Sequence, residues 1–424
     1  MLALAPALAL VLQAAAPGDW PQWRGPRLTG ASSETGLPVR WSTSENVAWK
    51  LDLPSHAAAT PVTAGQAIFL TVPEGDSVSL WSIDLAKGVA VWTRPLGPAA
   101  GHANRKHNMS SPSPATDGQH VYAMTGSGVV KGFDVSGREL WSRDFQKEYG
   151  AFGLNWGYAS SPLLYDGALF VEVLHGMRTS AASYVVRLDA ATGQTRWKVD
   201  RPTPAVNESP DAYTTPTLAK VGERTEIVVT GGDVVTGHDP ATGKELWRAT
   251  VLNPQHDPNY RIVASPVAAD DLVIAPSRVR PLVALRAGGQ GDVSVSHRLW
   301  SFDQGPDVPT PAIDGDLLYV VTDKGILWCL ESRTGRVRYG PQRLHPGTYS
   351  ASPLVADGRV YVTSEDGITS VVRAGPAFEL LAENALDDFT LASPVATHGR
   401  LLLRTARSLY CLSAAAKAAQ AGVR

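Results

Sequence analysis

The 424-residue sequence predicts an all-β protein, an eight-bladed β-propeller built from four-stranded antiparallel blades. Three observations lead to this prediction. A Ser-Pro or Thr-Pro step recurs at nearly regular spacing, several copies contain an Asp-Gly turn between short apolar runs, and most end in a run that carries a Trp. Repeats of this length are typical of propeller blades, since one such unit cannot bury its apolar faces alone.

The copy between residues 160 and 199 shows the unit most clearly. Ser161-Pro162 precedes an apolar run, and the turn Asp166-Gly167 separates this run from a second one. A third run ends at an Asp-Ala-Ala-Thr-Gly turn, and the fourth carries Trp197. Glycine permits positive φ at such turns, and proline at the first position of a strand removes no ladder hydrogen bond. The copy therefore contains the four strands of one blade.

The prolines of the Ser/Thr-Pro steps count the blades, and their mean spacing is about 48 residues. They are Pro61, Pro112, Pro162, Pro216, Pro266, Pro311, Pro353 and Pro394. The closing aromatic residues are Trp92, Trp141, Trp197, Trp247, Trp300, Tyr339 and Phe378. The eighth copy lacks a closing run, whereas residues 46–53 contain one, with Trp49, ahead of the first copy. We therefore predict that the ring closes by pairing the N-terminal strand with the C-terminal blade.

The chain divides into four predicted parts. Residues 1–16 are almost wholly apolar and end in three alanines, which indicates a secretory signal peptide, although the segment has no Lys or Arg. The alternative is a disordered apolar N-terminus. Residues 17–45 form a strap rich in Trp, Pro and Gly, residues 46–413 form the propeller, and residues 414–424 form a C-terminal tail. Export predicts a periplasmic or secreted protein.

The strap carries Trp20, Trp23 and Trp41. A Trp side chain has a large ring to bury, so we expect the strap to be ordered and to lie on the side or bottom of the propeller. The alternative interpretation is an aromatic platform for a ligand.

Composition excludes some classes of function. The formal charge is −2, which gives no field that would attract nucleic acid. No apolar run after residue 16 reaches the length that spans a membrane, so we expect no transmembrane segment.

The repeat resembles a known family. The pattern Asp-x-x-Thr-Gly-x-x-x-Trp within residues 187–197 and 237–247 is similar to the pyrroloquinoline-quinone (PQQ) repeat of quinoprotein dehydrogenases. It is equally similar to BamB-type outer-membrane assembly scaffolds, which share the repeat without the cofactor. Residues 20–26 and 46–50 resemble the N-terminus of secreted PQQ-binding-like β-propeller repeat proteins. The resemblance implies that each outer-strand Trp docks between neighbouring blades beside an Asp-x-x-Thr-Gly turn.

The resemblance also implies what a dehydrogenase would need, namely two adjacent cysteines in a disulfide against the quinone and a bound Ca²⁺. The chain has two cysteines, Cys329 and Cys411, which are 82 residues apart. Their positions predict equivalent third strands of the sixth and eighth blades, too far apart for a bridge. Motifs for haem attachment, a serine nucleophile, a zinc helix and a phosphate loop are also missing. We expect no cofactor, and PQQ with calcium only under the alternative function.

The loops that enter the inner strands share one face of a propeller and surround the mouth of its channel. The candidate ligand residues on these loops are His56, His107, Asn108, Trp156, Tyr158, Tyr213, Tyr260, Arg261, Asp307, Tyr349, Asp388 and Phe389. One interpretation is that the aromatic residues plug a wide ring. The other is a polar-aromatic mouth that binds a ligand.

Three functions remain open at this stage. The first is an exported, non-catalytic scaffold that binds an unknown protein, peptide or saccharide at the mouth. The second is a PQQ-dependent dehydrogenase with an atypical site. The third is an enzyme of another kind that uses the mouth residues.

Overall fold

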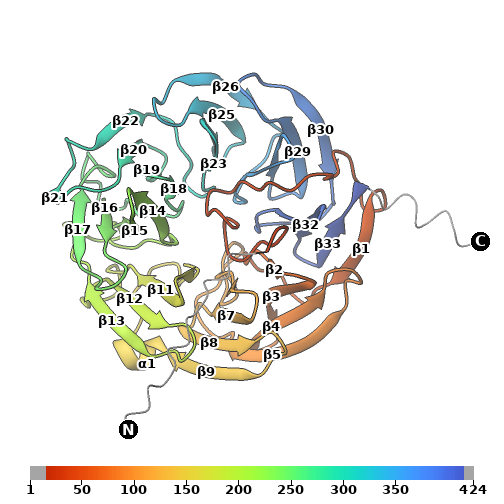
Figure 1. Cartoon of the computed structure of the whole chain (residues 1–424), viewed down its shortest axis with the longest axis horizontal. Helices are drawn as coiled ribbons and strands as arrows, with labels where there is room; N and C mark the ends of the chain where they lie inside the picture. Colours follow the sequence, from red (N-terminus) through yellow and green to blue (C-terminus); the bar gives the residue numbers. More distant parts are fainter. Residues whose placement is uncertain (1–15, 415–424) are drawn as a thin grey trace, which may run out of the picture.

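A computed structural model of the chain describes residues 16–414. The predicted signal peptide and C-terminal tail fall almost entirely on residues outside this range. Within it, the strands form eight sheets arranged as a ring, as Figure 1 shows. The prediction of an eight-bladed β-propeller is confirmed.

Within each of the first four blades, the strands follow chain order from the axis outward. Blade 1 contains β2 (Val62–Ala64), β3 (Ala67–Glu74), β4 (Ser77–Asp84) and β5 (Ala90–Pro98). Blade 2 contains β6 (Ala115–Thr116), β7 (His120–Met124), β8 (Val129–Asp134) and β9 (Glu139–Asp144), and the short helix α1 (Phe145–Tyr149) follows it. Blade 3 contains β10 (Leu163–Tyr165), β11 (Ala168–Val173), β12 (Tyr184–Asp189) and β13 (Thr195–Asp200). Blade 4 contains β14 (Thr217–Val221), β15 (Arg224–Gly231), β16 (Val234–His238) and β17 (Glu245–Ala249).

The remaining blades keep the same arrangement, with two additions. Blade 5 contains β18 (Val267–Ala269), β19 (Leu272–Ala275), β20 (Leu282–Arg286) and β22 (Arg298–Phe302), and β21 (Gly291–Asp292) pairs in parallel with β17 of blade 4. Blade 6 contains β23 (Ala312–Asp314), β24 (Leu317–Val321), β25 (Ile326–Glu331) and β26 (Val337–Arg343). Blade 7 contains β27 (Leu354–Ala356), β28 (Arg359–Thr363), β29 (Ile368–Arg373) and β30 (Leu380–Ala385). Blade 8 contains β31 (Val395–Thr397), β32 (Arg400–Arg404), β33 (Ser408–Leu412) and β1 (Val47–Asp52).

The ring closes between the two ends of the chain. Strand β1 pairs antiparallel with β33, and Trp49 lies opposite Cys411. Figure 1 shows β1 on the rim beside β33, where it supplies the fourth strand of blade 8. The predicted closure by the N-terminal strand is confirmed, and it leaves no unpaired edge on β33.

The hydrophobic core lies between neighbouring blades. All six residues of β11 are buried, because a second strand has a blade packed against each of its faces. The outer strand β13 instead alternates exposed and half-buried positions, as expected for an edge with one face toward solvent. Stability therefore comes from blade-on-blade packing around the whole ring.

Five tryptophans dock between blades as the resemblance implied. Trp141 on β9 donates its indole N–H to the carbonyl of Ala190 in blade 3 at 2.8 Å. A Cβ atom at Gly193, where φ is +69°, would lie 2.5 Å from the indole, so only glycine fits this turn. The same contact is made by Trp49 with Leu85, Trp92 with Val135, Trp197 with Pro240, and Trp300 with Ser332.

Trp247 is buried in one hydrophobic cluster with Ala287 and Val293 of blade 5, but the expected Asp-x-x-Thr-Gly turn is absent beside it. Its indole donates to the Glu226 carboxylate at 2.7 Å, within blade 4 itself. Blade 5 connects β20 to β22 through a longer segment that contains β21, and it has no Asp-x-x-Thr-Gly turn there. The backbone N–H of Gly288 also donates to Glu226, at 3.1 Å. A buried carboxylate therefore replaces the turn carbonyl.

The assignment of Phe378 to the closing position of blade 7 is wrong. The third and fourth strands of each blade are interrupted by a β-bulge, and in blade 3 Trp197 pairs with Arg187 just before it. At the equivalent position of blade 7, Ala382 on β30 pairs with Val371. Phe378 precedes β30 and packs its ring edge-on against Tyr339, with centroids 5.7 Å apart. The strap residue Trp41 joins Ala382 in one hydrophobic cluster and stacks on Tyr361 of β28, as Trp141 stacks on Tyr122 of β7 in blade 2.

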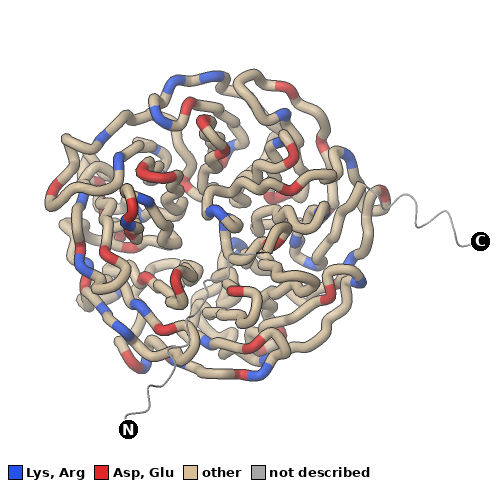
Figure 2. Tube along the Cα trace, in the orientation of Figure 1, with Lys and Arg blue, Asp and Glu red and all other residues tan. Residues whose placement is uncertain are grey.

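Both cysteines are free and buried, on β25 and β33, the third strands of blades 6 and 8, as predicted. Figure 2 shows acidic and basic residues interspersed around the ring. In the part of the chain between residues 16 and 414, no helix is long and apolar enough to cross a membrane.

Candidate functional site

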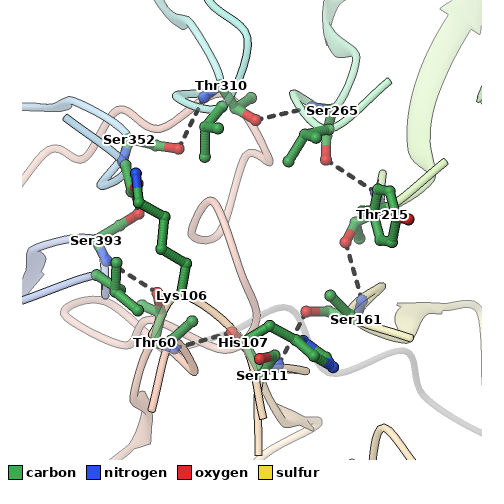
Figure 3. Close-up of a pocket in the computed structure, with 18 of the residues that line it drawn as sticks. Thr60, Lys106, His107, Ser111, Ser161, Thr215, Ser265, Thr310, Ser352 and Ser393 are labelled. Atoms are coloured by element: carbon green, nitrogen blue, oxygen red, sulfur yellow. Dashed lines mark hydrogen bonds between the residues drawn. The ribbon is translucent and has the colours of Figure 1, made fainter. Parts of the chain in front are cut away.

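A closed ring of hydrogen bonds surrounds the propeller axis (Figure 3). In each blade the residue before the first-strand proline donates its backbone N–H to the side-chain hydroxyl of the equivalent residue in the next blade. The donor–acceptor distances are 2.9–3.2 Å. The members of this hydroxyl ring are Thr60, Ser113, Ser161, Thr215, Ser265, Thr310, Ser352 and Ser393.

The ring corrects one position in the repeat count. Blade 2 contains two successive Ser-Pro steps, and the count used Pro112, whereas Ser113 before Pro114 occupies the ring. Ser111 lies two residues earlier and also lines the channel. Both steps match the sequence pattern, and only the hydrogen-bond register distinguishes them.

A cavity of about 400 Å³ lies on the axis and is bounded by all eight blades. The hydroxyl ring forms one layer of its wall. A second layer is formed by the residue two positions before each ring member, as expected for an extended chain whose alternate side chains share a face. This second layer is mainly apolar and consists of Ala58, Ser111, Ala159, Tyr213, Val263, Val308, Ser350 and Leu391.

The strap crosses the axis (Figure 1), and Trp23 lines the cavity. Arg24 holds the strap in place by donating to the carbonyls of Pro311 at 2.9 Å and Pro353 at 3.1 Å. Trp20 and Trp41 are buried in the core. The strap is therefore ordered, and its tryptophans divide between structural packing and the cavity wall.

A segment that we call the mouth loop, residues 102–108, spans from blade 2 across the opening. Lys106 forms an ion pair with Glu365 of blade 7 at 2.6 Å. The guanidinium of Arg105 lies 4.6 Å from the ring centroid of Phe389. His107 in the same loop is buried, and burial lowers its pKa to about 4, so it is neutral at physiological pH.

Arg261 lines the cavity on the side of blades 5 and 6. Its guanidinium pairs with both carboxylate oxygens of Asp307, at 3.1 and 3.3 Å. Asp323 lies behind this pair and accepts the backbone N–H of Asp307 at 2.6 Å. Burial raises the pKa of Asp323.

Trp156 lines the cavity on the side of blades 3 and 4 and is 46% exposed. Its indole N–H donates to Glu208 at 2.7 Å, and its backbone N–H donates to the Tyr213 hydroxyl at 3.1 Å. Asp211 nearby accepts backbone N–H groups from Asn155, Gly176 and Met177. Tyr213 and Trp156 are thus fixed in position.

The structure separates the predicted site residues into three groups. Those that line the cavity are His107, Trp156, Tyr213 and Arg261. Those that hold the mouth together through contacts with their neighbours are His56, Asn108, Asp307, Asp388 and Phe389. Those whose hydroxyls donate to backbone carbonyls are Tyr158 (to Glu172), Tyr260 (to Arg278) and Tyr349 (to His345).

Sequence reasoning missed the hydroxyl ring and left Lys106 out of the candidate ligand residues, and it considered Trp23 only in the alternative interpretation of the strap as an aromatic platform. The ring had a visible signal, since the Ser/Thr-Pro step recurs in every blade, but the step was used only to count repeats. Trp23 and Lys106 reach the cavity through contacts distant in sequence, which no local pattern reveals.

The carboxylates at the mouth already have partners. Glu365 pairs with Lys106, Asp307 with Arg261, and Asp388 with Arg407 at 3.3 Å. Within residues 16–414, no three His, Cys, Asp or Glu side chains are grouped so that they could hold a metal ion. The site therefore offers hydroxyl, aromatic and apolar contacts, together with ion pairs at its rim.

These features define a closed propeller of PQQ-like repeats with an axial cavity. The family model described as outer membrane protein assembly factor BamB matches residues 25–151 and 103–340, well over half of the chain. The chain belongs to this family of PQQ-like repeat propellers, as its resemblance indicated. No curated protein matches the sequence.

Solved structures with the same fold include enzymes and scaffolds. A europium-containing methanol dehydrogenase is 12% identical, with a TM-score of 0.72 over 95% of this chain and 99% of its own. The quinohemoprotein alcohol dehydrogenase from Comamonas testosteroni is 14% identical, with a TM-score of 0.69 over 95% of this chain and 81% of its own. BamB from Moraxella catarrhalis is 13% identical, with a TM-score of 0.58 over 86% of this chain and 98% of its own. At these identities the likeness shows the fold alone.

Proposed function

We propose that the protein is a non-catalytic binding propeller that holds part of a protein, a peptide or a saccharide in its axial cavity. The observation that carries the proposal is the construction of this cavity. All eight blades, the strap and the mouth loop contribute to one continuous wall, in which aromatic and apolar groups lie beside hydroxyls. Concave sites of this composition are the usual binding sites of proteins.

The state of the acids at the mouth supports a non-catalytic role. A general base needs a group that can take up a proton from the substrate within hydrogen-bond reach. Asp307 and Asp388 are each bound to an arginine, and Glu365 is bound to Lys106. Neutral His107 faces this site, but no carboxylate hydrogen-bonds to its ring among the described residues. These three ion-paired acids are therefore not free to act as general bases.

The alternative, a PQQ-dependent dehydrogenase, has less support. The resemblance to quinoprotein dehydrogenases implies that such an enzyme needs a calcium site and two adjacent cysteines. Cys329 and Cys411 lie on blades 6 and 8, and the mouth acids are engaged by cations. The cysteines and the mouth acids therefore do not fit PQQ with its calcium ion, and we propose no cofactor for this protein.

We also propose that the protein works in the periplasm or outside the cell, as the signal-peptide pattern of residues 1–16 predicts. Mass spectrometry of the protein recovered from its native host would give the mature N-terminus. A chain recovered from the cytoplasm with residues 1–16 intact would contradict this assignment.

A variant that fills the cavity tests the binding proposal. Ala159 lines the cavity, and Ala159→Trp would occupy much of its volume. Val206 is 61% exposed away from the cavity wall, so Val206→Trp adds the same side chain harmlessly. Glycan arrays and peptide libraries are probed with wild type, Val206→Trp and Ala159→Trp. Wild type and Val206→Trp should bind the same ligands, and Ala159→Trp should bind them at least about tenfold more weakly. Hits retained by a correctly folded Ala159→Trp protein would contradict the proposal.

A further inference from the structure

The hydroxyl ring has hydrogen-bonding capacity that the protein does not use. Each of its eight hydroxyl oxygens accepts one backbone N–H. A Ser or Thr hydroxyl also carries one O–H donor. Within residues 16–414, none of the eight donates that hydrogen to another group of the chain, and all eight residues line the cavity. The axis is therefore surrounded by eight O–H donors from eight blades.

A buried positive charge lies next to this ring. The side chain of Arg24 bonds to the carbonyls of Pro311 and Pro353, the residues that directly follow ring members Thr310 and Ser352. Arg24 is 4% exposed, and its Nε has no hydrogen-bond partner in the described part of the chain. No carboxylate forms an ion pair with it among these residues. Its charge therefore acts on the end of the cavity nearest the strap, where little water screens it.

Arg24 lies behind the cavity wall, whereas the charged groups that line the cavity itself are already neutralised. Lys106 is paired with Glu365, and Arg261 is paired with Asp307. The layer above the ring is mainly apolar, with Val263, Val308 and Leu391 among its members. The cavity thus combines a donor-rich, positively charged end with an apolar section toward the mouth.

We propose that the hydroxyl ring is a carboxylate-binding site, and that the ligand enters carboxylate first with a short apolar body in the layer above. The inference rests on the proposed function, since it assumes that the axial cavity is the binding site. A carboxylate has only acceptors, so it matches a ring of donors, and hydrogen bonds to a charged group are the stronger kind. A cation would be repelled by the buried charge of Arg24 and would leave the O–H donors without acceptors.

Three aryl probes of nearly equal shape separate the possible charges. They are 4-bromobenzoate, 4-bromobenzamide and 4-bromobenzamidinium, which are anionic, neutral and cationic. Calorimetric titration of the full chain should show the benzoate binding at least about tenfold more tightly than the amide, and no binding of the amidinium. The bromine anomalous signal in a soaked crystal should lie on the axis between the hydroxyl ring and the mouth loop. Equal affinity for the three probes, or preference for the amidinium, would overturn the proposal.

Paired threonine variants locate the site on the ring. Thr215→Val removes one ring hydroxyl, which is also the acceptor of the Ser161 backbone N–H. Thr217→Val removes a buried hydroxyl two residues later that has no hydrogen-bond partner among residues 16–414 and lies outside the cavity lining. We expect Thr215→Val to weaken benzoate binding about threefold to tenfold and Thr217→Val to leave it unchanged. Arg24→Met should abolish the preference for benzoate over benzamide. Because that variant also frees the strap, Thr215→Val keeps the test valid if Arg24→Met does not fold. Benzoate affinity that is the same in Thr215→Val as in wild type would contradict the assignment.

The source of the carboxylate can be a free organic acid or the C-terminus of a peptide. Competition against 4-bromobenzoate by a tetrapeptide ending in leucine, with a free carboxylate or as its amide, distinguishes them. If only the tetrapeptide with a free carboxylate displaces 4-bromobenzoate, the ligands are peptide C-termini. If neither form of the tetrapeptide displaces it, the ligands are free organic acids. If no carboxylate binds, but glycans or peptides still bind in a way that Ala159→Trp weakens, this inference is overturned and the proposed function is not.

Discussion

At the scale of single residues, the contact between a tryptophan and a glycine turn explains how neighbouring blades hold together. Trp141 is 9% exposed, and its indole covers Gly193 while donating to Ala190. The indole satisfies the turn carbonyl and buries a large apolar ring in one contact. Where the turn is missing, as beside Trp247, the buried carboxylate of Glu226 takes over the acceptor role.

Replacing Trp141 should therefore cost stability. We expect Trp141→Ala to lower the free energy of unfolding by about 3–5 kcal/mol, since it leaves a cavity and an unpaired carbonyl between blades 2 and 3. Trp156→Ala is the matched control, because this tryptophan is 46% exposed, and it should change stability by less than about 1 kcal/mol. Chemical denaturation measures both. An equal decrease in the free energy of unfolding of the two variants would show that docking of Trp141 between blades does not stabilise the protein.

Glu172 is a buried acid whose ionisation opposes folding. One of its oxygens accepts from Thr214 at 2.7 Å, and the other has no partner within the described residues. Burial raises its pKa from 4.5 to about 8. Below pH 4.5 the carboxyl is neutral in both the folded and the unfolded chain, so it imposes no penalty there. As the pH rises toward 8, the unfolded chain ionises first and is favoured, so stability falls through this window.

Glu172→Gln should remove this contribution because the amide stays neutral. We expect the difference in urea midpoint between the variant and wild type to grow in favour of the variant from pH 5 to about 8 and then level off. Glu139→Gln on β9, whose side chain is 44% exposed, serves as the control for a surface glutamate. A midpoint difference that does not change with pH would rule out a raised pKa at Glu172.

At the scale of elements, the repeat pattern predicted the blades because each strand pair is local in sequence. The closing strand β1 was also predictable, since the count of inner and outer strands balanced only if both ends paired. The errors have specific causes. Blade 7 shares the bulge of the other blades but has Ala382 at the closing position, so the search for an aromatic residue led to Phe378, four residues earlier.

Deletion of residues 46–53 tests the role of β1. Loss of this strand would expose the whole edge of β33, and we expect the shortened chain to form oligomers on size-exclusion chromatography and to melt at a lower temperature. A synthetic peptide with residues 46–53 should restore the monomer if the exposed edge is the cause. A monomeric deletion variant with the melting temperature of the intact protein would show that β1 does not close the ring.

At the scale of the whole molecule, the position of the strap and the composition of the cavity could not be predicted. Arg24 reaches its two acceptors across 287 and 329 residues of sequence, and no local pattern reports such contacts. The predicted ligand residues lie just before the inner strands, where alternate side chains face the channel and the others face neighbouring blades. Tyr213 therefore lines the cavity, whereas Tyr158 and Tyr349 point into the packing between blades.

A turnover assay decides whether the axial cavity binds its ligand without catalysing a reaction. Purified protein mixed with PQQ and Ca²⁺ should show no dye-linked oxidation of alcohols, aldose sugars or aldehydes above a blank without protein. The physical reason is that Asp307 and Asp388, two acids at the mouth, are held by Arg261 and Arg407. A steady rate above the blank, abolished by EDTA, restored by Ca²⁺ and lost in Asp307→Asn or Asp388→Asn, would contradict the account.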